Sequence, residues 1–272
     1  MRKIILFLFC LAFVNVKATK TLIPSGNSIQ DAINSAISGD TLILADSGEY
    51  IGTAITINKA ITIISENTRK LPKITTNGFL LQGGKGYYFK LENVEIIGNP
   101  AATNKHMITM NQSGDSAIYL KLYNVIGHDF ERCVIRMDKA TSYVDSVIVD
   151  NCYFYNFNKG GWNGFYWRDE RVITKYLKIT NTTLNGFNEG ILRFDGITFK
   201  KKIYIDRCTF NDRSTYNATK DANPLINVKG PAGSVFKMTN CIITDIDTIT
   251  VRAISIDSTV ADTIMNCRFF FD

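Results

Sequence analysis

The sequence is poor in the residues that usually mark a metal centre or an activated nucleophile. It contains only two histidines, His106 and His128, and no Cys-x-x-Cys pair among its six cysteines. A histidine–cysteine zinc site and a histidine-assisted nucleophile are therefore not indicated. His128 precedes Asp129, and a general-base role for this histidine is one hypothesis that the sequence leaves open.

Beyond its first residues the chain has no apolar run that reaches the roughly 20 residues needed to span a bilayer. Two basic residues precede the apolar run from Ile4 to Val14, and the small-x-small sequence Val16-Lys17-Ala18 follows it. This arrangement predicts a secretory signal peptide over residues 1–18 and a mature domain over residues 19–272. We therefore expect a secreted protein without a transmembrane segment.

The chain also lacks a strong excess of charge of one sign. It has 31 basic and 25 acidic residues, and removal of the three basic residues in the expected signal peptide leaves 28 against 25. No dense basic patch and no nucleic-acid-binding motif is visible in the sequence. Nucleic acid is therefore not an expected partner.

A six-residue pattern recurs through the chain: apolar, any, Asn, small or Cys, any, apolar. Its third position is occupied by Asn93, Asn124, Asn151, Asn181, Arg207, Asn240 and Asn266. Spacings of 26 to 33 residues fall in the range of solenoid repeats. Each period holds about three short runs rich in Ile, Val, Thr and aromatic residues, which predicts three β-strands per coil.

The repeat predicts an all-β fold, a right-handed parallel β-helix. Asn suits a sharp bend between strands because it tolerates the left-handed backbone conformation, and stacked Asn side chains can hydrogen-bond as a ladder. The residue after each Asn is expected to point into the core. A helix at about residues 28–38, with Asn27 or Ser28 as its N-cap, is expected to cover the first coil. For the C-terminal end the sequence leaves three alternatives: a partner chain or module covers it, the sequence is a truncated part of a longer natural product, or the aromatic residues 269–271 fold over it.

The cysteines fit this arrangement better than a disulfide framework. Without Cys10 an odd number remains, namely Cys133, Cys152, Cys208, Cys241 and Cys267. An odd number in an oxidising compartment argues against complete pairing. We expect buried, unpaired thiols that behave as small apolar residues, with a bridge between Cys241 and Cys267 as the alternative.

The N-terminal part resembles a known superfamily. Residues 28–44 read SIQDAINSAISGDTLIL, Gly48-Glu49-Tyr50 follows, and residues 55–64 read ITINKAITII. Over roughly residues 22–100 the chain resembles the pectate-lyase-like parallel β-helices, especially chondroitinase-B-like and alginate-lyase-like polysaccharide lyases and secreted bacterial β-helix proteins. The resemblance implies the fold. Lyases of that branch use a Lys base and an Arg, with calcium held by Asn and Glu on neighbouring coils. That cluster is not recognisable in this sequence, so catalysis is left open.

One strand of each coil carries outward polar residues just before a turn. These positions are expected to stack as Thr109, Arg136, Tyr166, Arg193, Asn227 and Ser255, beside Asn111, Asp138, Arg168, Asp195, Lys229 and Asp257. Guanidinium groups pair with carboxylates such as those of uronates. Arg136, Arg193 and Lys229 are therefore the candidate catalytic residues. The alternative is a solvated face on which Arg–Asp pairs balance charge.

The segment 153–167 is rich in aromatic residues that could stack on sugar rings. Tyr155, Trp162 and Tyr166 are predicted to be exposed substrate-binding residues, together with Arg168. The alternative is a loop that packs on its own aromatic rings. No cofactor is certain. A calcium site built from the oxygen atoms of Asn111, Asp138 and Asp195 is one that the sequence leaves open.

These observations favour a secreted protein that binds an acidic extracellular polysaccharide. If it is an enzyme, it is expected to be a polysaccharide lyase. The alternative function is a non-catalytic adhesion or scaffold module of the cell surface.

Overall fold

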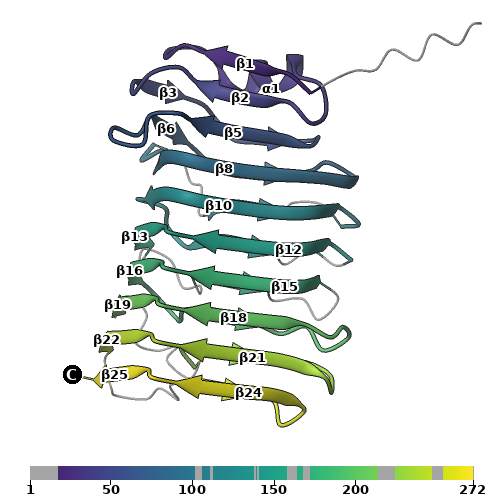
Figure 1. Cartoon of the computed structure of the whole chain (residues 1–272), viewed down its shortest axis with the longest axis vertical. Helices are drawn as coiled ribbons and strands as arrows, with labels where there is room; N and C mark the ends of the chain where they lie inside the picture. The colour runs from purple at the N-terminus through teal and green to yellow at the C-terminus, as the bar shows by residue number, and fades with distance from the viewer. Residues whose placement is uncertain are drawn as a thin grey trace, which may run out of the picture.

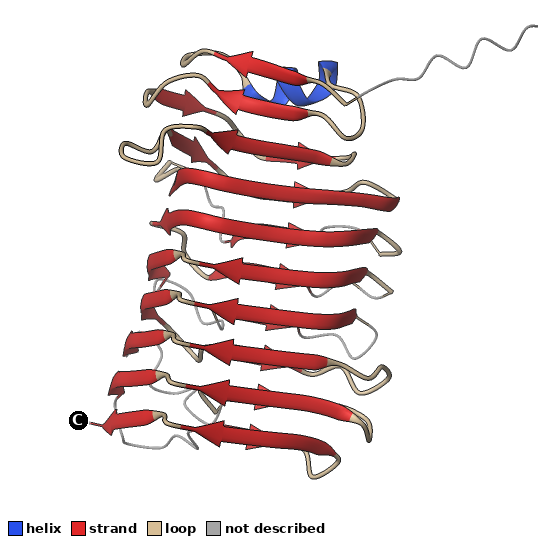
Figure 2. Ribbon diagram, in the orientation of Figure 1, coloured by secondary structure: helices blue, strands red, loops and turns tan. Residues whose placement is uncertain are grey.

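The computed structural model describes residues 18–101, 106–110, 113–137, 139, 141–157, 164–167, 172–213, 224–246 and 254–271. In these residues parallel strands stack coil upon coil into an elongated solenoid (Figures 1 and 2). The predicted fold class, an all-β parallel β-helix with a short N-terminal helix, is confirmed. Every strand pairs with the equivalent strand of the neighbouring coil, so one residue of each coil forms a column along the long axis.

Two runs of strands form the larger sheet. The front run faces the viewer in Figure 1 and comprises β1 (Lys20–Ile23), β2 (Thr41–Leu44), β5 (Ile61–Ser65), the first parts of β8 (Lys85–Gly98) and β10 (Ser116–His128), β12 (Tyr143–Asp150), β15 (Ile173–Thr180), β18 (Lys202–Asp206), β21 (Ser234–Thr239) and β24 (Val260–Met265). The short run comprises β3 (Glu49–Ile51), β6 (Lys73–Thr76), the last parts of β8 and β10, β13 (Tyr153–Phe157), β16 (Thr183–Phe187), β19 (Thr209–Arg213), β22 (Ile242–Ile246) and β25 (Arg268–Phe271).

A separate eight-stranded sheet forms the third side of the solenoid within the described residues. It contains β4 (Ile55–Ile57), β7 (Phe79–Leu81), β9 (His106–Met110), β11 (Cys133–Met137), β14 (Phe165–Trp167), β17 (Leu192–Phe194), β20 (Ile226–Val228) and β23 (Ile254–Ile256). Three sides of stacked strands enclose one continuous apolar interior.

The bend between the front run and the short run lies at the third position of the sequence repeat. From Asn93 to Asn266 all seven residues at this position, Arg207 included, have φ between 50° and 55°. Asn124 donates through Nδ2 to Asn93 Oδ1 at 2.9 Å and accepts from Asn151 Nδ2 at 3.4 Å. The left-handed backbone is the reason that the repeat favours Asn at this position.

Substitution of Asn124 tests whether the left-handed backbone explains the preference for Asn at the bend. We expect Asn124→Ala to lower the free energy of unfolding by about 1–2 kcal/mol from left-handed strain, plus about 1 kcal/mol for the lost hydrogen bonds. Asn124→Gly loses the same bonds but accepts positive φ, so it should cost less. Denaturant unfolding of both variants measures this difference, and an equal loss in the two would contradict the role assigned to backbone strain.

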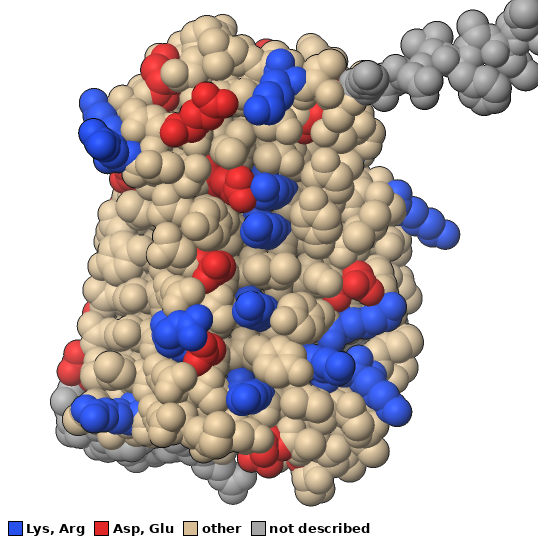
Figure 3. Space-filling view, viewed as in Figure 1, with Lys and Arg blue, Asp and Glu red and all other residues tan. Residues whose placement is uncertain are grey.

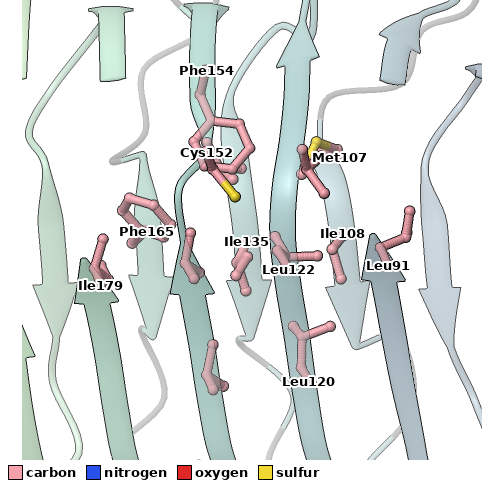
Figure 4. Close-up of a cluster of buried hydrophobic side chains, with 14 of the residues drawn as sticks. Leu91, Met107, Ile108, Leu120, Leu122, Ile135, Cys152, Phe154, Phe165 and Ile179 are labelled. Atoms are coloured by element: carbon pink, nitrogen blue, oxygen red, sulfur yellow. The ribbon is translucent and has the colours of Figure 1, made fainter. Parts of the chain in front are cut away.

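The residue after the bend points into the core, as predicted. Cys152, Cys208 and Cys241 are buried, and the disulfide considered between Cys241 and Cys267 is not formed. Figure 4 shows Cys152 in the interior beside the buried Phe154. The prediction of buried thiols holds for Cys152, Cys208 and Cys241, whereas Cys267 is only partly buried. Burial raises the pKa of Cys152 to about 12. This thiol therefore stays protonated near neutral pH.

The side chains of facing runs meet in the same interior. In Figure 4, Leu91, Leu122 and Ile179 of the front run and Ile135 and Phe165 of the eight-stranded sheet point into it. All five are at most 1% exposed. Because successive side chains of a strand point to opposite faces, the residues between them lie on the outer surface. This alternation presents the polar columns of the repeat to solvent.

The N-terminal helix α1 (Ile29–Ser35) is shorter than the predicted span of residues 28–38. Ser28 is its N-cap, and its hydroxyl accepts from the Asp31 backbone N–H at 3.1 Å. The helix ends early because the Asp40 carboxylate accepts the Ile37 N–H at 2.9 Å, which draws the chain out of the helical path. Ile29 and Ile33 are buried against the first coils.

The far end of the solenoid is open in the part of the chain that the structure describes. Met238 is fully buried, whereas Ile264, its register partner in the last coil, is 38% exposed. Neighbouring Met265 is 48% exposed. Among the described residues, no helix has the length and apolarity required to cross a membrane.

Candidate functional site

The predicted outward column lies on the eight-stranded sheet in the predicted order. Arg136 pairs in register with Thr109 on one side and Tyr166 on the other, and Tyr166 pairs with Arg193. Asn227 follows Arg193 in the next coil. Arg136 and Arg193 are thus two strand spacings apart, roughly 10 Å. The sheet therefore presents two guanidinium groups on one face along the solenoid axis.

The first arginine is supported by a histidine from the preceding coil. Arg136 Nη1 lies 3.0 Å from His106 Nε2, and His106 is buried. A guanidinium can only donate, so this imidazole nitrogen is the acceptor. The contact orients the Arg136 side chain without neutralising its positive charge.

The second arginine belongs to an ion-pair network across two coils. Arg193 Nε donates to Asp195 Oδ2 at 2.8 Å. Asp195 Oδ1 accepts from Asn227 Nδ2 at 3.2 Å and lies 3.9 Å from Lys229 Nζ. Arg193 also lies over the Tyr166 ring, with its Cζ 5.8 Å from the ring centroid. One carboxylate thus faces two cations, and the cluster keeps a net positive charge.

A buried lysine, which sequence reasoning missed, lies beneath this network. Lys201 is only 3% exposed, and its Nζ donates to the carbonyl oxygens of Gly196 and Lys229, the latter at 2.6 Å. The Nζ lies 4.2 Å from the Phe194 ring centroid. Burial lowers the pKa of Lys201 to about 8, although the negative charges of Asp257 and Asp195 act in the opposite direction. No spacing in the sequence distinguishes this lysine from exposed Lys200 and Lys202.

The lowered pKa of Lys201 predicts a pH-dependent stability. Below about pH 8 the amine is charged in both the folded and unfolded states, whereas between about pH 8 and pH 10.5 only the unfolded state retains the proton. The contribution of Lys201 to the free energy of unfolding should therefore rise with pH through that window. Thermal unfolding of the wild type and Lys201→Met across the window measures it. Lys202→Met is the exposed control, and a pH-independent difference for Lys201→Met would contradict the assignment.

Tyr166, the aromatic residue nearest the arginines, was predicted to be exposed, and this prediction is wrong. Tyr166 is only 2% exposed, because its ring lies between neighbouring coils and beneath the Arg193 guanidinium. It supports Arg193 and offers no open ring face. Trp162 and Arg168 lie outside the described residues. Their predicted sugar-binding roles stay predictions.

Tyr155 lies on a different side of the solenoid from the arginines. It belongs to β13 of the short run, where its ring stacks on His128 with a centroid distance of 4.4 Å. His128 Nδ1 lies 2.7 Å from Asp129 Oδ2, and its Nε2 lies 3.1 Å from Glu95 Oε1. Both ring nitrogens are thus engaged by carboxylates. This arrangement fits a structural contact between coils better than a general base.

Of the three calcium ligands considered from sequence, only Asp195 lies in the described part of the chain. Asn111 and Asp138 lie outside the described part of the chain. The Asp195 carboxylate is already engaged by Arg193 and Lys229, and two cations beside it would repel a divalent ion. Within the described ranges, no cluster of three or more His, Cys, Asp or Glu side chains forms a metal site. Asp195 therefore does not fit a calcium ion.

The fold links the chain to solved polysaccharide lyases. It is similar in structure to an alginate lyase of the PL6 family, AlyGC, with a TM-score of 0.64 and 17% sequence identity. The match covers 93% of this chain and 40% of the lyase. An arginine-to-alanine variant of that lyase gives the same TM-score with 18% identity, over 93% of this chain and 37% of the other.

Sequence comparisons add no closer relationship. No protein-family model matches the sequence, and a search of curated proteins gives no match. The chain spans less than half the length of the alginate lyases that share its structure. At this level of identity the likeness establishes the fold. By its fold, the chain is a parallel β-helix similar to those of the solved alginate lyases.

Proposed function

We propose that the protein is exported and binds an acidic polysaccharide on the outer face of the eight-stranded sheet, and that it cleaves this polymer as a lyase. The register of Arg136, Tyr166 and Arg193 on consecutive strands is the observation that supports this proposal most. It gives a linear polyanion two guanidinium partners along the direction in which the solenoid extends. The similarity in fold to alginate lyases is consistent with such a substrate.

The chemistry of a uronate lyase assigns a role to each proposed residue. A guanidinium that pairs with the uronate carboxylate stabilises the negative charge that develops when the neighbouring C5 proton is removed. Lys229, one coil beyond Asp195 and 3.9 Å from it, is the proposed base that takes this proton, after its own ammonium proton has passed to solvent. The C4–O bond then breaks, its electron pair leaves with the oxygen, and that oxygen is protonated. The products are an unsaturated uronate and a shortened chain.

One observation favours the alternative function, a non-catalytic module of the cell surface. The Arg193 guanidinium already has a carboxylate partner in Asp195 at 2.8 Å. A substrate carboxylate must therefore share Arg193 with Asp195 or replace it. In the scaffold alternative, this pair only balances charge between coils.

The test is an ultraviolet assay for the double bond that a lyase creates. The purified protein is incubated with polygalacturonate, alginate and a neutral glucan, and binding is measured in parallel. We expect absorbance to rise with an acidic polymer only. Binding to acidic polymers without any product would support a binder, and neither binding nor product would support the scaffold function.

The open end of the solenoid, formed by the last described coil, is a second surface that could bind a partner. Its exposed Ile264 and Met265 form an apolar surface of a kind that often contacts another protein. We propose that a partner chain or module contacts this end. Size-exclusion chromatography with light scattering, compared between the wild type and Met265→Lys, tests for self-association.

A further inference from the structure

The front run carries a column of lysines that the proposed arginine site does not use. Figure 3 shows Lys and Arg side chains aligned down the middle of this face. The strand register places them in one column with Thr62 at one end and Thr263 at the other. Between these ends the column reads Lys90, Lys121, Ile148, Lys178, Tyr204 and Lys237.

The two halves of this column differ in their electrostatic partners. Lys90 and Lys121 both face Glu92, with Nζ–Oε1 distances of 2.8 and 3.8 Å. Lys178 and Lys237 are partly exposed and form no ion pair with any described residue, although their charges reach Asp150 and Asp206 through space. Within this column, only Lys178 and Lys237 therefore offer ammonium groups that are available to an external anion.

Two tyrosines lie among these lysines. The rings of Tyr176 and Tyr204 have centroids 5.7 Å apart and are tilted by 47°. With Lys178, Lys237 and Arg207 they line a depression of about 300 Å³. Aromatic faces bind the apolar faces of sugar rings, whereas ammonium groups bind acidic substituents. The combination therefore suits a sugar that carries negative charge.

A second depression adjoins the first and shares Tyr176. It has a volume of about 320 Å³ and is lined by Lys175, Lys200 and Lys202 as well as by buried Lys201. Lys175 already pairs with Asp145 at 3.2 Å, whereas exposed Lys200 and Lys202 add positive charge. The two depressions together extend the basic surface across the front run.

A carboxylate in the first depression argues for a sugar polymer over a nucleic acid. Asp206 Oδ1 accepts from Thr239 Oγ1 at 2.6 Å and from Asn240 Nδ2 at 2.9 Å. The hydrogen bond from Thr239, together with Asn240, Arg207 and Lys237, holds the pKa of Asp206 below its ordinary value. Asp206 Oδ2 pairs with Arg207 Nη1 at 2.6 Å, and the ionised carboxylate can accept hydrogen bonds from sugar hydroxyls, which the phosphate backbone of duplex DNA does not offer.

We propose that the depression around Tyr176, Tyr204, Lys178 and Lys237 is a second binding site for an anionic polysaccharide, on a different side of the solenoid from Arg136 and Arg193. Its role is to hold the polymer without reacting with it. The class of ligand, an anionic polysaccharide, rests on the proposed function. The place where this ligand binds is inferred from the front run alone.

The experiment compares two double variants that remove the same charge from the same column. Lys178→Gln/Lys237→Gln alters the lysines without an ion pair, and Lys90→Gln/Lys121→Gln alters those that face Glu92. Affinity for polygalacturonate, alginate, a sulfated glycan and duplex DNA is measured at fixed salt, with thermal unfolding as the control for folding. We expect the first variant to bind anionic glycans at least about tenfold more weakly, because two charge-assisted contacts are lost. The second variant should bind like the wild type.

A third variant separates this inference from the proposed function. If Arg136→Gln/Arg193→Gln abolishes binding and Lys178→Gln/Lys237→Gln does not, the arginine face is the site and the inference is wrong. The reverse result supports the inference and contradicts the arginine face. Equal losses in the two lysine variants would indicate unspecific charge attraction and overturn the inference. Absence of glycan binding by the wild type, or a preference for DNA that depends on Lys178 and Lys237, would overturn it as well.

Discussion

Arg193→Ala is expected to reduce product formation from an acidic polysaccharide by about 10²- to 10³-fold, the usual loss when one group that stabilises a developing anion is removed. The arginine lies on the outer face of β17, beside Tyr166 and Asn227. Its removal leaves Asp195 with Lys229 as its remaining cation at 3.9 Å. That carboxylate would then repel the substrate. The measurement is kcat/KM in the ultraviolet assay, with affinity measured separately.

Two further variants make this result interpretable. Arg193→Lys keeps the positive charge but loses the planar fork that pairs with a carboxylate, so its activity should lie between those of the wild type and Arg193→Ala. Arg69→Ala changes an exposed arginine in the turn after β5 and should leave activity unchanged. Full activity in Arg193→Ala, with an unchanged thermal midpoint, would exclude the arginine face as the reactive site.

Trp167→Ala is expected to lower the free energy of unfolding by about 3–5 kcal/mol, the usual cost of truncating a large buried aromatic residue. Trp167 is fully buried beneath the arginine column. Its ring stacks on Phe194 with a centroid distance of 5.2 Å, and its Nε1 donates to Thr174 Oγ1 at 3.0 Å. Truncation leaves a cavity and removes the partner of a buried hydroxyl. Denaturant unfolding gives the size of the loss.

The matched control is Trp167→Phe, which keeps a ring against Phe194 but removes the hydrogen bond to Thr174. Its expected cost is roughly 1–3 kcal/mol, mainly from the unpaired hydroxyl and the smaller ring. A loss in Trp167→Ala no greater than in Trp167→Phe would show that the stacked ring adds little stability to this part of the core.

The lysine column of the front run was within reach of sequence reasoning. Lys90, Lys121, Lys178 and Lys237 each lie three residues before the bend position of their repeat. Alignment of the repeats on that position would have placed them in one column, because parallel in-register pairing puts equivalent residues side by side. No sequence pattern indicated the ion pairs of Lys90 and Lys121 with Glu92. Glu92 is a single acidic residue whose reach to Lys121 depends on side-chain geometry.

The sequence by itself determined the solenoid, the bend at each Asn, the inward cysteines and the stacking of Arg136, Tyr166 and Arg193. Each follows from a periodic pattern, since one residue per coil becomes one column when strands pair in parallel and in register. Only the tertiary structure decided that Tyr166 is covered, that Tyr155 stacks on His128 and that Lys201 is buried. These outcomes depend on which side chains from neighbouring coils and turns pack together. The length and path of the turns vary from coil to coil, whereas the strand pattern of the repeat stays the same.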